Sequence, residues 1–145
     1  MTAQKTASRK ASEVFSDEEK AAMRDAAEER RAAASTDPEA EVLAKIAEMK
    51  PDDRAMAERI HALVKAAVPD IEPRTWYGMP AYAKGGNTIC FFQSAQKFKT
   101  RYATLGFSDK ARLDDGDLWP NAFAVQKMTP AVEKRITQLI KQAVG

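Results

Sequence analysis

The stretch WYGMPAY, Trp76–Tyr82, decides the fold because it joins a helical first half of the chain to a second half that predicts strands. Arg74–Gly78 and Ala81–Lys84 are predicted to be short extended segments, separated by a kink at Met79-Pro80. Pro80 has no amide hydrogen to donate, so a sheet cannot pair normally there. The stretch therefore predicts either the centre of the core or the wall of a concave site.

The residues after this stretch predict an antiparallel sheet. Gly85-Gly86 is a two-residue turn of the kind that hairpins prefer, since both glycines accept a positive φ. Asn87–Ser94 is the predicted return strand. Lys97–Leu105 alternates basic with apolar side chains, as a half-buried antiparallel strand does. Leu118–Val125 is expected to be the last strand.

Helices are predicted on both sides of these strands. Ser16 begins a capping box, and the helix that follows runs to about Ala34 with few apolar residues. Glu39–Met49 and Asp52–Val68 each show an apolar face at helical spacing. The pairs Asp37-Pro38 and Thr129-Pro130 are typical of helix starts, the second one for a C-terminal helix.

This order of elements predicts an α+β fold. We expect an antiparallel sheet of four to six strands, with the two helices in 39–67 and the C-terminal helix packed on one face. The domain would span residues 37–145. Residues 16–36 would form an N-terminal helical arm, and residues 1–15 a disordered tail.

Composition narrows the functional classes. The 145 residues carry a formal net charge of +2, which is too small to point to nucleic acid. A single cysteine, Cys90, excludes an internal disulfide and favours the cytoplasm. No secretory signal or membrane-spanning run is predicted, so no membrane partner is expected. His61 is the only histidine, and no zinc-site spacing occurs.

The first candidate site is the kink itself. Its predicted ligand-binding residues are Trp76, Tyr77, Met79, Pro80, Tyr82 and Phe92. The alternative is that the aromatic residues fill the core, and this is the favoured interpretation for the rings of Trp76, Tyr77, Phe91 and Phe92. Tyr82 is expected to emerge from the sheet at the kink.

Two further candidate sites are charged. Lys97, Lys99 and Arg101 would form a basic row that binds an anion or a partner, or that merely guards a strand edge. Glu41, Glu48, Asp52 and Asp53 could hold a hard metal ion, although interleaved lysines and arginines favour a salt-bridged helix surface. Cys90 is expected to be a small buried apolar residue, and His61 a partly buried, hydrogen-bonded one.

The segment Tyr77–Tyr82 resembles the signature of the YdhG-like family, bacterial domains mostly of unknown function. A Gly-Met-Pro-aromatic element, a glycine hairpin, a strand ending in Phe91-Phe92, a basic segment and a closing helix occur here in the family's order, over about residues 39–144. Some members are described as frataxin-like iron chaperones. Two departures are the absence of a histidine near Lys99 and the added N-terminal helix.

Three functions remain open at this level. The preferred one is a non-catalytic cytoplasmic binding module for an unknown small ligand or protein partner, with its site at the kink. The second is a frataxin-like iron-binding protein, and iron is implied only by the resemblance. The third is a protein- or nucleic-acid-interaction module that uses the basic segment Lys97–Arg101. No acid–base pair can be named for an enzyme, and we expect a monomer or a weak homodimer formed through the N-terminal arm.

Overall fold

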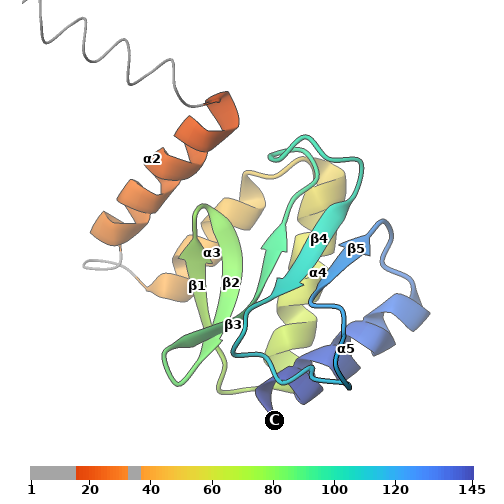
Figure 1. Cartoon of the computed structure of the whole chain (residues 1–145). Helices are drawn as coiled ribbons and strands as arrows, with labels where there is room; N and C mark the ends of the chain where they lie inside the picture. The colour runs from red at the N-terminus through yellow and green to blue at the C-terminus, as the bar shows by residue number, and fades with distance from the viewer. Residues whose placement is uncertain (1–15, 33–36) are drawn as a thin grey trace, which may run out of the picture.

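The computed structural model describes residues 16–32 and 37–145, apart from the side chains of 28–32. The described residues form four helices and five strands, whose arrangement can be followed in Figure 1. In chain order they are α2 (Asp17–Ala32), α3 (Pro38–Ala47), α4 (Pro51–Ala67), β1 (Glu72–Trp76), β2 (Met79–Lys84), β3 (Asn87–Gln93), β4 (Ala103–Phe107), β5 (Ala122–Val125) and α5 (Pro130–Val144). The predicted disordered tail of residues 1–15 lies outside the described residues.

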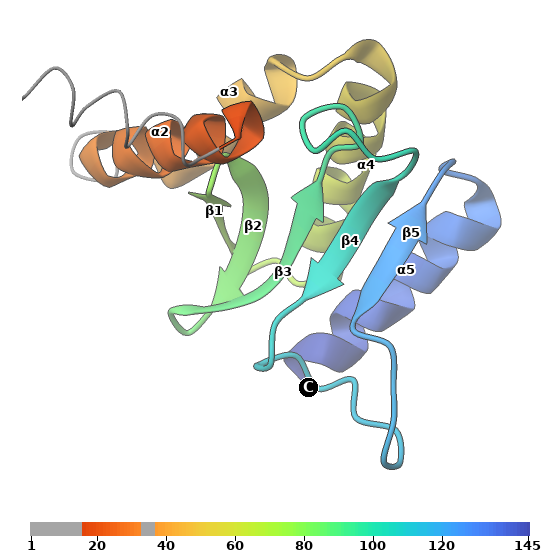
Figure 2. The same cartoon turned by 45° about the horizontal axis from the view of Figure 1, so that its top comes forward.

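The five strands form one antiparallel sheet in which each strand pairs with its neighbour in sequence, in the order β1-β2-β3-β4-β5 (Figure 2). The predicted glycine hairpin is confirmed: Gly85 and Gly86 have φ values of 57° and 82° and join β2 to β3. These angles suit the right-handed twist of the two strands. A bulge between Tyr82 and Ala83 shifts the register of that pair.

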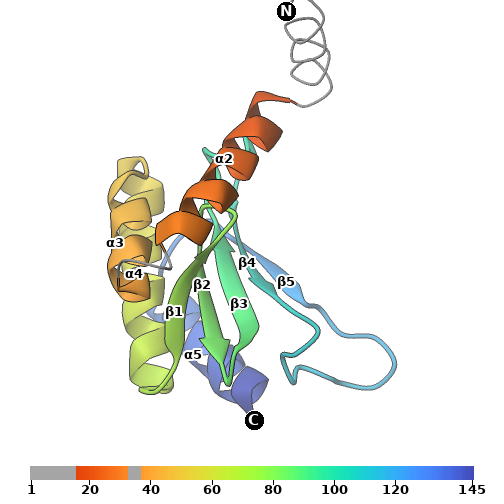
Figure 3. The ribbon, with the colours of Figure 1, turned by 90° about the vertical axis from the view of Figure 1, so that its left-hand side faces the viewer.

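Helices α3, α4 and α5 cover one face of the sheet (Figure 3). Their apolar stripes meet the inner face of the strands in a core whose largest fully buried side chains include Ile46, Ile60, Phe92, Leu105 and Ile140. A half-buried sheet and amphipathic helices stabilise each other by removing these surfaces from water. The predicted α+β fold, with its helices on one face, is thereby confirmed.

The predicted helix starts are also confirmed. The Asp37 carboxylate accepts a hydrogen bond from the amide of Glu39 (3.2 Å), and Pro38 is the first residue of α3. The Thr129 hydroxyl accepts one from the amide of Val132 (3.2 Å) ahead of α5. Both side chains satisfy an amide that has no partner within its helix.

The predicted kink at Met79-Pro80 is wrong. Tyr77 and Gly78, with φ values of 50° and 76°, form a two-residue turn, and Trp76 pairs with Met79 across it. Met79 and Pro80 therefore begin β2 instead of interrupting the sheet. Pro80 pairs with Thr75 of β1, and the described β2–β3 ladder ends one residue further on, at Ala81 and Phe91. Proline has no amide hydrogen to donate, and it is tolerated here because β3 does not pair with it.

The predicted strand Lys97–Leu105 begins only at Ala103. Residues 94–102 form a compact loop, because the Asp53 carboxylate accepts hydrogen bonds from the amides of Ala95 (3.4 Å) and Gln96 (3.1 Å). Lys99 has a φ of 53°, which no regular strand allows. The last strand is likewise shorter than predicted, starting at Ala122, and Leu118 is almost fully exposed.

Helix α2 lies at one end of the sheet, beside the β1–β2 turn and apart from the layer formed by the other three helices (Figure 3). The Ser16 hydroxyl accepts from the amide of Glu19 (3.1 Å), as the predicted capping box requires. None of the side chains in 17–27 is buried. The helix therefore contributes nothing to the apolar core through the side chains that the structure describes.

Candidate functional site

A pocket of about 270 Å³ lies where α2, the β1–β2 turn, the end of β3 and the α3–α4 junction meet. Its position is set by the divergence of β2 from β3 beyond the Ala81–Phe91 pair, although β3 continues to Gln93. The lining residues are Asp25, Lys45, Glu48, Met49, Lys50, Asp53, Gly78, Met79, Phe92, Ser94, Gln96 and Lys97.

The apolar part of the pocket comes from Met49, Met79 and Phe92. Met79 is 7% exposed and Phe92 is fully buried, so both present fixed apolar surface to the pocket. Met49 is partly buried and packs against the core at the end of α3. An apolar lining with a few placed polar groups is the usual composition of a small-molecule site.

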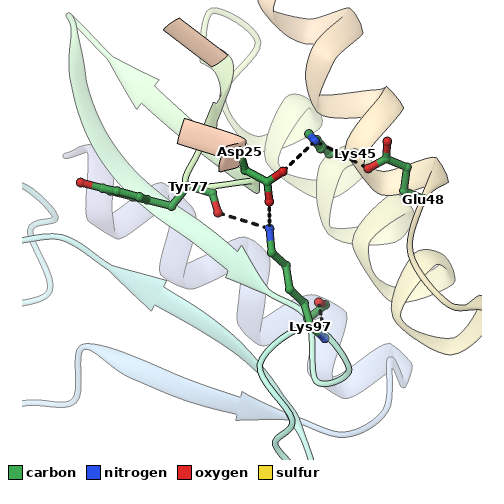
Figure 4. A network of polar contacts seen from close by, with 6 residues as sticks. Asp25, Lys45, Glu48, Tyr77 and Lys97 are labelled. Carbon is green, nitrogen blue, oxygen red and sulfur yellow. Dashed lines mark hydrogen bonds and ion pairs between the residues drawn. The ribbon is translucent and has the colours of Figure 1, made fainter. Parts of the chain in front are cut away.

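The polar part is a network centred on Asp25 of α2 (Figure 4). Lys97 donates to the Asp25 carboxylate, and Lys45 donates to its other oxygen at 3.3 Å. Lys45 is also 3.7 Å from Glu48, and the Lys97 ammonium lies 3.4 Å from the carbonyl oxygen of Tyr77. Cations from two different elements thus converge on one carboxylate from a third.

Gly78 permits this convergence. A Cβ atom at Gly78 would overlap the Lys97 ammonium and the Asp25 carboxylate. The residue also has a φ of 76°, a conformation that L-amino acids with a side chain rarely adopt. Gly78 is therefore required twice, once by the turn and once by the close approach of charged groups.

Electrostatics favour the ionised form of Asp25. Burial by itself would raise the pKa of the Asp25 carboxyl, but the hydrogen bond and charge of Lys97 and the charge of Lys45 lower it below its ordinary value. The carboxylate is therefore negatively charged at neutral pH.

Of the six predicted ligand-binding residues, the structure places two in the lining of the pocket and the other four elsewhere. Met79 and Phe92 line the pocket, and Phe92 is buried in the core as expected. Pro80 is buried beside them. Trp76 and Tyr77 are 41% and 48% exposed, so the interpretation of their rings as core is wrong.

Trp76 and Tyr77 belong to an aromatic cluster outside the helix-covered core. The Trp76 ring lies 5.2 Å from the rings of both Tyr77 and Phe91, in edge-on contacts, and Phe91 is itself only partly buried. Phe91 lies over Gly106 of β4, whose missing side chain leaves room for the ring. Period-two alternation along β3 places Phe91 on the opposite face from Phe92, which explains the different burial of two adjacent rings.

Tyr82 does not emerge from the sheet but is fully buried in the core. Its hydroxyl is 2.9 Å from Nδ1 of His61, and His61 Nε2 is 2.9 Å from the Glu39 carboxylate. Lys65 donates to the second oxygen of Glu39 at 2.8 Å. The hydrogen bond from Lys65, and then that from His61, lowers the pKa of Glu39. His61 is hydrogen-bonded, as the sequence predicts, and it is buried where a partly buried residue was expected.

Cys90 is fully buried in the core, as expected of a small apolar residue. Burial raises the pKa of its thiol to about 12. The thiolate, which is the nucleophilic form, is therefore scarce at neutral pH.

The basic residues do not form a row, since no strand runs through them. Lys97 belongs to the pocket, whereas Lys99 pairs with Glu18 of α2, and this hydrogen bond raises the Lys99 pKa. Arg101 lies over the ring of Tyr102, with 5.3 Å from its guanidinium carbon to the ring centroid. Two of the three predicted partner-binding cations therefore bind α2 of the same chain.

The predicted metal ligands are dispersed. Glu48 pairs with Lys45, Asp53 accepts from two loop amides, Asp52 is exposed, and Glu41 is partly buried on α3. Within residues 16–32 and 37–145, no three His, Cys, Asp or Glu side chains are grouped as metal ligands. Iron binding stays a prediction that the geometry neither favours nor tests.

Sequence reasoning missed Asp25, Lys45, Ser94 and Gln96 as pocket residues. Asp25 and Lys45 are single charges among many on exposed helix surfaces, and nothing in their local pattern distinguishes them. Ser94 is the last residue of one predicted strand, and Gln96 lies between that strand and the next. The sequence does single out Lys97 as an anion-binding candidate and Glu48 and Asp53 as metal-ligand candidates, and all three line the polar part of the pocket.

A scan against models of protein families and searches of curated proteins and of solved structures found no match. The resemblance to the YdhG-like family therefore stays a prediction. In the part of the chain that the structure describes, the helices are too short or too polar to cross a membrane.

Proposed function

We propose that this chain is a non-catalytic binding module whose small ligand binds in the pocket beside Gly78 and Met79. The observation that carries the proposal is the composition of that pocket, with apolar surface from Met79 and Phe92 and a polar side that includes Lys45 and Lys97. Its volume of about 270 Å³ is close to the lower bound of small-molecule sites, roughly 300 Å³.

The polar groups of the pocket suit binding better than acid–base chemistry. The carboxylates of Asp25, Glu48 and Asp53 are each engaged, the first two by lysines and the third by backbone amides. Groups held in this way give a pocket its shape and charge, whereas a general base needs a free lone pair near the reacting proton. The module would work in the cytoplasm, where a lone thiol such as that of Cys90 stays reduced.

Three probes with the same ring and different charges test this proposal. Benzoate, benzamide and benzylammonium are titrated into the full chain, and amide shifts are followed by NMR. We expect at least one probe to shift amides around Gly78, Met79 and Ser94 in a saturable way. The Gln96→Trp variant should weaken that binding, because Gln96 is an exposed residue of the pocket lining and an indole there would obstruct it.

The matched control is Arg101→Trp, another exposed position in the same loop, which does not line the pocket. It should bind the probe as the parent chain does. Absence of localised shifts with all three probes, or equal binding by the Gln96→Trp and parent chains, would overturn the proposal.

A further inference from the structure

We infer that the ligand of this pocket carries a carboxylate, and that Asp25 of α2 occupies the place of that carboxylate when α2 is docked. The inference rests on the proposed function, since it names the chemical class of the ligand and the way in which access is controlled. It combines the geometry around Asp25, the charges that line the pocket and the weak attachment of α2.

The geometry around Asp25 is that of a bound anion. Lys45 comes from α3 and Lys97 from the β3–β4 loop, and their ammonium groups meet at opposite oxygens of one carboxylate (Figure 4). Both cations belong to the domain, whereas the carboxylate is supplied by the arm. Gly78 leaves the space in which this anion lies. A ligand carboxylate in the same position would accept the same two charge-assisted hydrogen bonds.

The described charges of the pocket change from balanced to positive when Asp25 leaves with α2. Among the described residues, its lining holds three lysines (Lys45, Lys50, Lys97) and three carboxylates (Asp25, Glu48, Asp53). Without Asp25 the three cations face two carboxylates, and the one on Asp53 accepts two backbone amides of the loop. An undocked arm therefore leaves a pocket with one excess positive charge, which favours an anionic ligand.

The described contacts of α2 with the rest of the chain are mainly between charged groups, and such contacts can be released. Met23 is the only large apolar residue in its sequence, and that side chain is 51% exposed. Among the side chains that the structure describes in this helix, the ion pairs to the rest of the chain are those of Asp25 and that of Glu18 with Lys99. The side chains of these pairs all keep some exposure, so water and salt compete with the pairs. A ligand carboxylate can therefore replace Asp25 without unfolding the core.

The remainder of the ligand should be apolar and small. Met49, Met79 and Phe92 lie next to the two lysines, so a short hydrocarbon or a single ring attached to the carboxylate would contact them. Asp25 is itself a carboxylate held between these lysines, which favours this group over the larger, more highly charged phosphate.

The test compares the parent full chain with Asp25→Ala and with Asp25→Asn, which keeps the shape and removes the charge. Benzoate, benzamide and inorganic phosphate are titrated into each by NMR. We expect benzoate to bind about tenfold more tightly to Asp25→Ala, because an internal competitor has been removed. In the parent chain, benzoate should also move the α2 amides toward their positions in Asp25→Ala. Glu19→Ala, an exposed carboxylate of the same helix, should leave benzoate affinity unchanged.

Each other result of these titrations would contradict one part of the inference or the proposed function on which it rests. Weaker benzoate binding by Asp25→Ala would make Asp25 a part of the site and end its role as a substitute. Equal binding of benzamide and benzoate by both Asp25 variants would end the carboxylate inference and leave the binding module standing. Tighter binding of phosphate than of benzoate would also end the carboxylate inference and leave the binding module standing. Failure of benzoate, benzamide and phosphate here, together with failure of benzylammonium in the first test, would instead contradict the proposed function.

Discussion

The two sides of this molecule that receive helices are held together by different forces. On the sheet face covered by α3, α4 and α5, fully buried apolar side chains such as Ile60 and Leu105 pack together. At the end of the sheet next to α2, lysines meet Glu18 and Asp25, and the described side chains of the helix all retain some exposure. The first contact is made by removing apolar surface from water, whereas the second depends on charge.

The polar groups also differ between the core and the contact with α2. In the core, the Tyr82 hydroxyl lies 2.9 Å from Nδ1 of His61, and burial raises the pKa of that hydroxyl, so Tyr82 stays neutral. Near α2, the polar groups are ions whose partners come from other elements. A buried hydrogen bond is costly to break because the Tyr82 hydroxyl would be left in the core without a partner. A surface ion pair can exchange its partner for water or for another ion, which is what a ligand-controlled contact requires.

The largest expected effect separates the two contacts by stability. Leu105→Ala should lower the free energy of unfolding by about 2–5 kcal/mol, since it removes a fully buried side chain and leaves a cavity. Met23→Ala on α2 should change it by less than about 0.5 kcal/mol, because that side chain is half exposed. Urea unfolding followed by circular dichroism measures both. Similar losses in the two variants would mean that α2 is part of the core.

A smaller effect is expected at Gly78, which belongs to both the sheet and the α2 contact. Gly78→Ala forces a side chain into a φ of 76°, at a cost of about 1–2 kcal/mol, and displaces Asp25 and Lys97. Gly85→Ala is the matched control, because it has a positive φ of 57° but open space around it. Both variants should lose stability in urea, but only Gly78→Ala should shift the α2 amides in NMR spectra. Shifts of the α2 amides that are equally large in Gly78→Ala and Gly85→Ala would mean that Gly78 has no particular role in the α2 contact.

The smallest expected effect is the acid sensitivity of α2. The lysines lower the pKa values of Asp25 and Glu18 below 3.8 and 4.5, so the contact is stabilised at pH values above these and weakens as the pH falls through the lowered values. Amide shifts of α2, followed by NMR during an acid titration, should change before those of Phe92 and Leu105. A rise in sodium chloride at neutral pH should act in the same direction. If the α2 amides and the core amides changed together in a single acid transition, the α2 contact would not be distinct from the core in the way described above.

Local signals predicted the local structure correctly. The caps at Asp37 and Thr129 and the turn at Gly85-Gly86 depend on hydrogen bonds and backbone angles within a few residues, so a short stretch of sequence contains all that they need. The α+β order followed from the change of apolar period after Pro73. The loop 94–102 could not be found in this way, because Asp53, more than forty residues earlier, supplies the carboxylate that orders it.

The candidate site was predicted only in part. Met79 and Phe92 were named from their composition, and Lys97 from its charge, but these were assigned to two separate sites. The structure unites them because the β2–β3 ladder ends early and the loop after β3 turns back toward Asp53. Trp76 and Tyr77 were misassigned because the two-residue turn at Tyr77-Gly78 leaves both rings largely in solvent.

By itself the sequence determined the helices, most strand positions and the apolar faces that build the core, since each depends on spacing and on neighbours along the chain. Only the tertiary structure decided which charges meet. Asp25 binds Lys97, 72 residues further along, and Lys45, 20 residues along, through contacts with no local signature. Apolar residues need only be buried together, whereas an ion pair needs two particular atoms within a few ångströms of each other. For that reason the fold was predictable from pattern, and the pocket with its α2 contact was not.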